Sequence, residues 1–341
     1  MKLNNGRIVT SGEEPYFIAE VNTSHFGDIE IAQQLVQSAK ETGCDCVKFQ
    51  SWSAESLYSN THYERNPIAK RFVQKFSLTP EEQQHLASFS NHKGISFAST
   101  PYSAKEVDFL LERCDVPFIK IASMEINNTP LLKYIGATKS AIVLSTGMAD
   151  IEEIDGAVEA LLSTNNSQLC IMHCVSIYPA ENETINLNNI LLLRERYPGI
   201  DIGYSDHTLG YEVPIASVAL GAAIVEKHFT LDSKRIGMDN QMAMEPEDFK
   251  TMITQCKSAW KSLGSRTRQV SNDELTQRRN MRRSIVSART IPKGKKIEYS
   301  DLAFKRPGDG YPPSQLNQVV GKIAKQDIGG DEVIYPSQIS T

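Results

Sequence analysis

Eight short runs rich in β-branched and other apolar residues recur along the first three quarters of the chain, and this repetition limits the possible folds most strongly. Near-continuous apolar character is typical of strands that are covered on both faces of a parallel sheet. Each run is therefore predicted to be a buried strand. The runs are residues 16–21, 45–51, 94–99, 118–123, 141–145, 169–175, 200–205 and 223–228.

Segments of helical character lie between these runs, for example residues 29–42, 80–93, 104–114, 151–163 and 246–263. One helix start is specific: Thr79 is suited to the N-cap, Pro80 to the first helical position, and Glu82 completes a capping box. Eight strands alternating with helices over roughly 260 residues favour a (β/α)8 barrel, with an open doubly wound sheet as the second choice.

The two ends of the chain differ from this pattern. Asn5-Gly6 predicts a hairpin, which we expect to close the bottom of the barrel. Residues 264–281 are polar and charged and are interpreted as a linker or an exposed helix. Residues 282–341 form a small β-rich domain with expected strands at 284–287 and 296–298, so the chain divides into a barrel over 1–263, the linker and this domain.

Composition gives a soluble, cytoplasmic protein as the expectation. The net charge of −5 gives no reason to expect a nucleic-acid partner. The six cysteines form no CxxC pair and are expected to be buried free thiols in a reducing compartment. The first residues do not resemble a secretory signal, and no apolar stretch is long enough for a membrane span.

Polar residues gather where the predicted strands end. Lys48 and Lys120 lie in the apolar contexts CDCVKFQ and PFIKIAS, and His207 and His228 end two successive strands. The active site of a (β/α)8 barrel lies at the carboxyl ends of its strands. These side chains are therefore expected to meet at one functional rim.

Nine motifs resemble those of the sialic acid synthase family, in the same order. They are AEVNTSHFGD (19–28), VKFQ (47–50), FASTPYS (97–103), IKIASMEINN (119–128), VLSTGM (143–148), MHCVSIYP (172–179), GYSDHTLG (203–210), VEKHFTLD (225–232) and KRPGDG (305–310). The resemblance implies a (β/α)8 barrel followed by a small antifreeze-like (SAF) domain.

The resemblance also implies a transferase reaction. Phosphoenolpyruvate condenses with an acetamido sugar to give a nine-carbon 2-keto-3-deoxy acid and phosphate, with Mn²⁺ or Mg²⁺ as the metal. N-acetylmannosamine, its 6-phosphate and a 2,4-diacetamido-trideoxy hexose all stay open as the sugar. Departures from the family motifs at Asn22, Ser24 and Ser176, and in residues 234–246, concern mainly the substrate side.

Residue roles follow from the matched motifs. His207 and His228 would bind the metal, which suits neutral imidazoles, and would share the catalytic role with Glu20 and Glu125. Lys48 and Lys120 would hold phosphoenolpyruvate, as lysines suit phosphate and carboxylate groups. The remaining expected substrate contacts are Gln50, Thr100, Ser123, Ser145, Tyr178, Ser205, Asp239 and Arg306.

Arg306 lies outside the predicted barrel. The resemblance implies that it reaches the sugar in the active site of a second subunit, and hence a domain-swapped homodimer. Two other functions remain open. One is a barrel aldolase that forms an imine on a lysine. The other is a non-catalytic sugar-binding protein of polysaccharide biosynthesis that retains the fold.

Overall fold

The computed structural model describes residues 1–340 and divides into two compact units, Met1–Gly264 and the residues from Ser265 onwards. The first unit contains all eight predicted strands, with bounds within three residues of those expected. They are β1 (Tyr16–Glu20), β2 (Cys46–Gln50), β3 (Ser96–Thr100), β4 (Ile119–Ile121), β5 (Ile142–Ser145), β6 (Leu169–Cys174), β7 (Asp201–Asp206) and β8 (Ile224–His228).

These strands form one parallel sheet in the order β3-β2-β1-β8-β7-β6-β5-β4. The sheet is nearly closed, because β3 and β4, the two ends of this order, lie in contact. Glu20 is in register with Lys48 on one side and with His228 on the other, so the carboxyl ends of neighbouring strands meet at one rim. The predicted (β/α)8 barrel is confirmed, and the doubly wound alternative is wrong.

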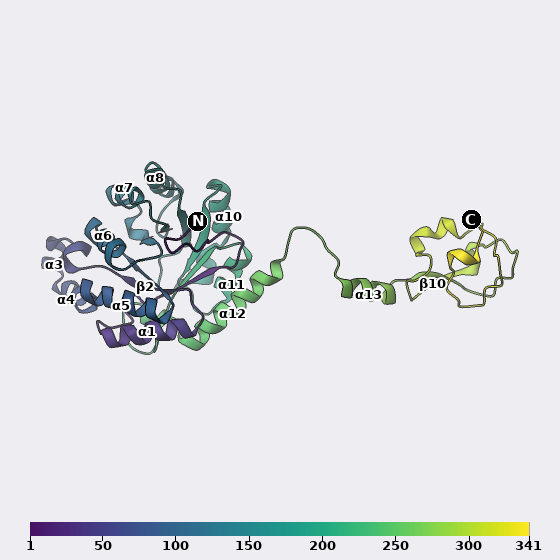
Figure 1. The fold of residues 1–341 in the computed structure, drawn as a ribbon, viewed down its shortest axis with the longest axis horizontal. Coiled ribbons are helices and arrows are strands. Elements are labelled where there is room, and N and C mark those ends of the chain that lie inside the picture. Colours follow the sequence, from purple (N-terminus) through teal and green to yellow (C-terminus); the bar gives the residue numbers. More distant parts are fainter. Residues whose placement is uncertain (341) are drawn as a thin grey trace. The chain divides into compact units, whose positions relative to one another are not determined.

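Helices cover the outside of the barrel (Figure 1). Thr79 caps α5 through the expected capping box with Glu82. The helices of this unit are α1 (Ile29–Glu41), α2 (Ala54–Leu57), α3 (Asn60–Arg65), α4 (Pro67–Phe76), α5 (Pro80–Lys93), α6 (Ala104–Arg113), α7 (Thr129–Ala137), α8 (Ile151–Leu162), α9 (Asn182–Ile185), α10 (Asn188–Arg196), α11 (Glu212–Ala219) and α12 (Pro246–Leu263), with short 3-10 helices at Ser123–Glu125 and Asn240–Met242.

Strand periodicity divides the core into two parts. Alternate residues point to opposite faces of a strand, so Phe17 and Ala19 pack outwards against the helices, whereas Tyr16 and Ile18 pack inside the barrel. The inner cluster is apolar over the amino-terminal half of the strands. Polar residues such as Glu20 take over the same inward positions at the carboxyl ends, so the apolar half forms the floor of a polar cavity.

The predicted hairpin closes the amino-terminal end of the barrel. Lys2 pairs with Ile8, and Leu3 and Val9 join the inner apolar cluster. Asn4 receives a hydrogen bond of 3.0 Å on its side chain from the backbone N–H of Ala141, just before β5. These contacts confirm the expected position at the bottom.

The C-terminal unit contains α13 (Asn272–Met281), β9 (Ser284–Ser287), β10 (Leu302–Lys305) and short 3-10 helices at Tyr299–Asp301, Pro313–Gln318 and Pro336–Gln338. Helix α13 has no buried residue, which matches the expectation of an exposed helix. The strand expected at 296–298 is wrong: Lys296 makes only an isolated bridge to Ile323, and β10 pairs with β9 instead. No helix within residues 1–340 is long and apolar enough to cross a membrane.

Candidate active site

A cavity of about 320 Å³ opens at the carboxyl ends of the barrel strands. It brings together the predicted site residues with the exception of Glu125 and Arg306. Those that line it are Glu20, Lys48, Gln50, Thr100, Lys120, Ser123, Ser145, Tyr178, Ser205, His207, His228 and Asp239. The spacing of two between Lys48 and Gln50 explains why both side chains point inwards from one strand.

Four buried charges form the centre of this cavity. Lys48 forms an ion pair with Glu20 and lies 3.8 Å from Glu226, and Lys120 lies 3.9 Å from Glu226. All four side chains are at most 7% exposed. Burying a charged side chain is costly unless an opposite charge compensates it. The two lysines and the two glutamates therefore stabilise one another in the buried state.

The pKa values of the two carboxyl groups, Glu20 and Glu226, are shifted in opposite directions. Burial raises the pKa of Glu20, and the neighbouring Glu226 charge adds to this rise while Lys48 opposes it. Burial also acts on Glu226, but Lys120 and Lys48 outweigh it and lower the pKa of that carboxyl. A pair of carboxyl groups with separated pKa values is suited to divided acid and base roles.

The side of the cavity near β4 and β5 is rich in hydrogen-bond donors. Lys120 Nζ lies 2.5 Å from Ser145 Oγ, and Ser123 Oγ accepts from the Gly147 N–H at 2.9 Å. A side chain at Gly147 would meet Ser176 Oγ at 2.1 Å, so the backbone can approach this closely only as glycine. The arrangement is suited to an anion with several oxygens.

Two histidines face the cavity from neighbouring strands. The rings of His207 and His228 have centroids 5.2 Å apart. His207 Nδ1 lies 2.6 Å from the carbonyl oxygen of Val175, and His228 Nδ1 lies 2.7 Å from Asp239 Oδ2. Because each Nδ1 has an acceptor, the proton of a neutral ring belongs there and Nε2 carries the lone pair.

This tethering is the arrangement found for histidines that bind metals, whose second nitrogen donates to a carboxylate or carbonyl. Both residues therefore fit a divalent ion as ligands through Nε2. Within residues 1–340 there is no group of three or more His, Cys, Asp or Glu side chains placed to hold a metal. The protein would supply two ligands, and the others would come from water or substrate.

Asp239 is fixed from three directions. Its Oδ2 receives hydrogen bonds from His228 and from Asn22 at 2.5 Å, and Thr23 donates to Oδ1 at 3.3 Å. Burial opposes ionisation of this carboxyl, but the His228 and Asn22 contacts outweigh it and lower its pKa. Asp239 thus lines the cavity as expected, and the structure adds an orienting contact to His228.

A second buried pair supports the histidines from behind. Lys227 and Asp206 form an ion pair on the outer face of the strands, and Lys227 Nζ also donates to the carbonyl oxygen of Thr208 at 2.7 Å. Asp206 accepts from the Tyr204 hydroxyl at 2.8 Å. These contacts fix the turn that carries His207.

Gln50 and Tyr178 line the cavity nearer its mouth. Gln50 Nε2 donates to Glu20 Oε1 at 2.7 Å, and the Tyr102 hydroxyl donates to Gln50 Oε1 at 2.8 Å. Lys48 Nζ donates to Thr100 Oγ1 at 3.2 Å. Tyr178 is half exposed and packs on His207 with a centroid distance of 4.2 Å.

Two predicted site residues lie elsewhere. Glu125 ends the short helix after β4, and its Oε2 accepts from the Asn128 amide at 2.7 Å instead of lining the cavity. Arg306 belongs to the C-terminal unit and is exposed there. The barrel cavity described above is formed without either of them.

Sequence reasoning gave no role to Glu226, Tyr102 or Trp52, although all three line the cavity. The position of Glu226 could have been predicted from strand periodicity, because it lies two positions before His228 in one strand and so shares the same face. Tyr102 and Trp52 are in loops, where no periodicity indicates direction. Their place was therefore open until the fold was known.

The chain matches the NeuB family over residues 35–268 and the SAF domain over residues 282–340. It is 35% identical to the N,N'-diacetyllegionaminic acid synthase of Legionella pneumophila, over 94% of this chain and 93% of that protein. It is 31% identical to the human N-acetylneuraminate-9-phosphate synthase, over 98% of this chain and 95% of that protein.

Among solved structures, the N-acetylneuraminic acid synthetase of Leptospira borgpetersenii superposes with a TM-score of 0.73 at 30% identity. The match covers 79% of this chain and 92% of that chain. Together with the family match over most of the barrel, these similarities confirm the family resemblance of the sequence motifs. The chain belongs to the NeuB family.

Proposed function

We propose that this protein condenses phosphoenolpyruvate with an acetamido hexose to give a nine-carbon 2-keto-3-deoxy sugar acid and phosphate. The observation that carries the proposal is the meeting of two buried lysines with two tethered histidines in one cavity. The lysines suit a trianion, and the histidines suit a metal beside a carbonyl oxygen. The named relatives, which are synthases of such acids, support the same reaction class.

The donor-rich side of the cavity would hold phosphoenolpyruvate. Lys48 and Lys120 would supply the positive charge, with the hydroxyls of Ser123, Ser145 and Ser205 around the phosphate. The methylene carbon of phosphoenolpyruvate would bond to the aldehyde carbon of the open-chain sugar. Water would add to the neighbouring carbon, and phosphate would leave as that carbon becomes a ketone.

Glu20 is the group we assign to proton transfer at this centre. Because the pKa of Glu20 is raised, a larger fraction of its carboxyl group is protonated near neutral pH than in an ordinary glutamate. The pKa of Glu226 is lowered, so this carboxyl group stays ionised between the lysines. Gln50 and Lys48 fix the orientation of the Glu20 carboxyl from two sides. Glu125, which lies beside Asn128, would act from the margin of the site.

His207 and His228 would hold the divalent ion, Mn²⁺ or Mg²⁺, through Nε2. The bound ion would act as a Lewis acid toward the aldehyde oxygen. Asp239 would keep His228 in the ligating orientation and offer its remaining lone pairs to sugar hydroxyls.

We further propose that the sugar carries no phosphate and is a 2,4-diacetamido-trideoxy hexose. Among the lining residues that the structure describes, Lys48 and Lys120 are the only lysines and there is no arginine, so a second phosphate would lack its own cation. The lining also includes four large apolar side chains, Trp52, Met124, Met148 and Met238. Such a wall suits a methyl group better than a phosphomethyl or hydroxymethyl group.

We propose that the working form is a homodimer in which Arg306 of each subunit completes the site of the other. Met148, Met238 and Tyr178 at the mouth are 70%, 59% and 50% exposed, which is unusual for large apolar side chains grouped at one opening. Exposed Arg306 offers a cation for the acetamido or carboxylate oxygens. All six cysteines are free and buried, which fits the reducing cytoplasm as the proposed location.

The test is phosphate release from phosphoenolpyruvate by the full chain with Mn²⁺. N-acetylmannosamine, its 6-phosphate and 2,4-diacetamido-trideoxy hexoses would be supplied separately. We expect release with the diacetamido sugar, abolished by EDTA and restored by added Mn²⁺. Release only with the 6-phosphate would overturn the proposed sugar, and no release with any sugar would overturn the reaction.

One observation favours a second candidate, a lysine-imine aldolase. Burial lowers the pKa of Lys120, with Glu226 opposing the effect, and a lysine with a lowered pKa is suited to imine formation. Borohydride added with pyruvate would then attach the three-carbon unit to Lys120. Mass spectrometry would detect this product, which a phosphoenolpyruvate-dependent synthase does not form.

A further inference from the structure

A second cavity, of about 450 Å³, lies at the opposite end of the barrel, and the chemistry proposed above makes no use of it. We call it the basal cavity. It is lined by residues at the amino-terminal ends of three neighbouring strands: Tyr16 begins β1, Asp45 precedes β2 and Ser96 begins β3. Its size is within the range of small-molecule sites.

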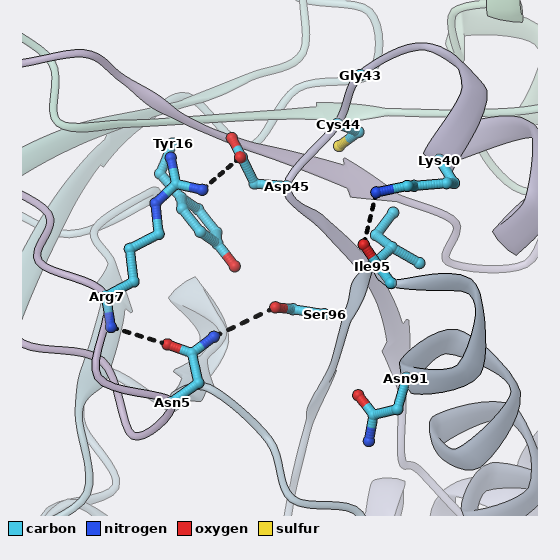
Figure 2. A pocket seen from close by; sticks show the side chains of 11 residues that line it. Asn5, Arg7, Tyr16, Lys40, Gly43, Cys44, Asp45, Asn91, Ile95 and Ser96 are labelled. Atoms are coloured by element: carbon cyan, nitrogen blue, oxygen red, sulfur yellow. Dashed lines mark hydrogen bonds and ion pairs between the residues drawn. The ribbon is translucent and has the colours of Figure 1, made fainter.

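The walls of the basal cavity offer many more hydrogen-bond donors than acceptors (Figure 2). Lys40 uses one of its three N–H groups on the carbonyl oxygen of Gly94, at 2.6 Å. Arg7 places its guanidinium over the Tyr16 ring at 4.7 Å and donates to Asp45 Oδ1 at 2.5 Å. Both oxygens of Asp45 are engaged, because Oδ2 accepts from the Phe17 N–H at 2.8 Å.

Charge in the basal cavity is unbalanced in the same direction. Arg7 and Lys40 carry two positive charges against the single negative charge of Asp45, and Arg7 is already paired with that carboxylate. Lys40 has no carboxylate partner within 4.0 Å among the described residues. One positive charge is thus left for a ligand.

The Tyr16 hydroxyl gives an independent indication of a ligand. Tyr16 is 1% exposed, and its hydroxyl is buried without a hydrogen-bond partner among residues 1–340. Figure 2 shows the hydroxyl pointing into the cavity between Arg7 and Ser96. Burial raises the pKa of Tyr16, so the group remains a donor at physiological pH. A buried hydroxyl without a partner is costly, and a ligand oxygen would remove that cost.

We propose that the basal cavity binds a small oxyanion, a carboxylate or a phosphate group, between Tyr16, Arg7 and Lys40. The Tyr16 hydroxyl and the free N–H groups of the two cations would donate to its oxygens. The amides of Asn5 and Asn91 at the edge would bind neighbouring hydroxyls, so a sugar acid or a sugar phosphate is the class that fits. This site is separate from the catalytic cavity at the other end of the same strands.

Equilibrium dialysis of the full chain with radiolabelled inorganic phosphate tests this site. The chain carries Lys120→Met, which weakens phosphate binding in the catalytic cavity and leaves the lining of the basal cavity unaltered. We expect one phosphate to remain bound per chain. Sodium gluconate in a parallel arm would displace it if the site also accepts carboxylates, and failure to displace would make the site specific for phosphate.

Two variants and a matched control identify the location. Tyr16→Phe keeps the ring in place and removes only the hydroxyl. Lys40→Met removes the unpaired charge, and Lys93→Met removes another exposed lysine, which lies outside the cavity lining. Added to Lys120→Met, each of the first two is expected to weaken the remaining phosphate binding by about tenfold or more, and Lys93→Met is expected to leave it unchanged.

Phosphate binding in the basal cavity does not require the proposed reaction, so the two proposals can fail separately. Absence of binding for both phosphate and gluconate, in Lys120→Met protein with normal circular dichroism, would show that only water fills the basal cavity. Binding that Tyr16→Phe and Lys40→Met leave unchanged would place the anion elsewhere. Either result overturns the proposal.

Discussion

The two ends of the barrel strands hold charge in different ways. At the carboxyl ends, Lys48 pairs closely with Glu20, but Lys120 reaches its carboxylate, Glu226, only at 3.9 Å. At the amino-terminal ends, Arg7 pairs with Asp45 at 2.5 Å, and Lys40 has no carboxylate partner among the described residues. Lys120 is buried and stays available to a ligand of the catalytic cavity, whereas the Arg7–Asp45 pair joins the hairpin to the barrel. The proposed chemistry thus belongs to one end of the strands, and the ion pair that anchors the hairpin belongs to the other.

The largest expected effect concerns Lys120→Met. Loss of the charge should lower kcat/KM by about 10³-fold, because a buried donor to the developing charge is removed. The free energy of unfolding should stay the same or rise, because burial lowers the pKa of Lys120 and so disfavours its charged form in the fold, while Lys48 still lies 3.8 Å from Glu226 and compensates it. Steady-state phosphate release and urea unfolding measure the two effects. Loss of stability together with activity would show that Lys120 is structural and would break the contrast between the ends.

Glu226→Gln should act in the opposite direction on stability. It leaves Lys120 buried without its carboxylate, which should lower the free energy of unfolding by about 3 kcal/mol. The double variant with Lys120→Met should recover much of that loss, because both charges are then absent. Denaturant titration of the wild type, both single variants and the double variant completes the cycle. Additive effects would mean that the two residues do not interact.

Asp239→Asn tests the tethered histidine. The amide would hold His228 less firmly, and the affinity for Mn²⁺ should fall by about 10- to 100-fold. Isothermal titration with Mn²⁺ measures this directly, and Asp232→Asn, in a nearby exposed turn, serves as the control. An unchanged Mn²⁺ affinity would mean that Asp239 serves only the sugar.

The smallest effect is expected at the amino-terminal end. Asp45→Asn removes the ion pair with Arg7 but keeps an acceptor for the Phe17 N–H, so it should cost about 1 kcal/mol of stability. kcat should not change. Thermal unfolding and phosphate release test the two statements, and a change in kcat greater than about twofold would show that the two ends are coupled.

Local sequence patterns were sufficient for most of the fold. The eight strands and the start of α5 depend on periodicity and capping, which act over a few residues, and both were predicted closely. The strand predicted at residues 296–298 was wrong, because Lys296 pairs only through a single bridge with Ile323, which is distant in the sequence.

The candidate site divides in the same way. Lys48, Lys120 and the two histidines are at strand ends and could be placed together from the barrel alone. Contacts between loops could not be predicted in this way, because they depend on the paths of two loops that are distant in sequence. The contact of Asp239 with Asn22 is an example. The position of Glu125 beside Asn128 likewise depends on one short helix after β4.

The sheet order leaves one seam, since β3 and β4 touch without being hydrogen-bonded neighbours in the part of the chain that the structure describes. Thr100 ends β3 and Lys120 lies in β4, and both line the cavity. An anion held between them would contact both strands and so connect the two edges for as long as it is bound. Binding of phosphoenolpyruvate should then reduce local opening at this seam. Amide hydrogen exchange in β3 and β4 should slow when it binds, while exchange in β7 should change little.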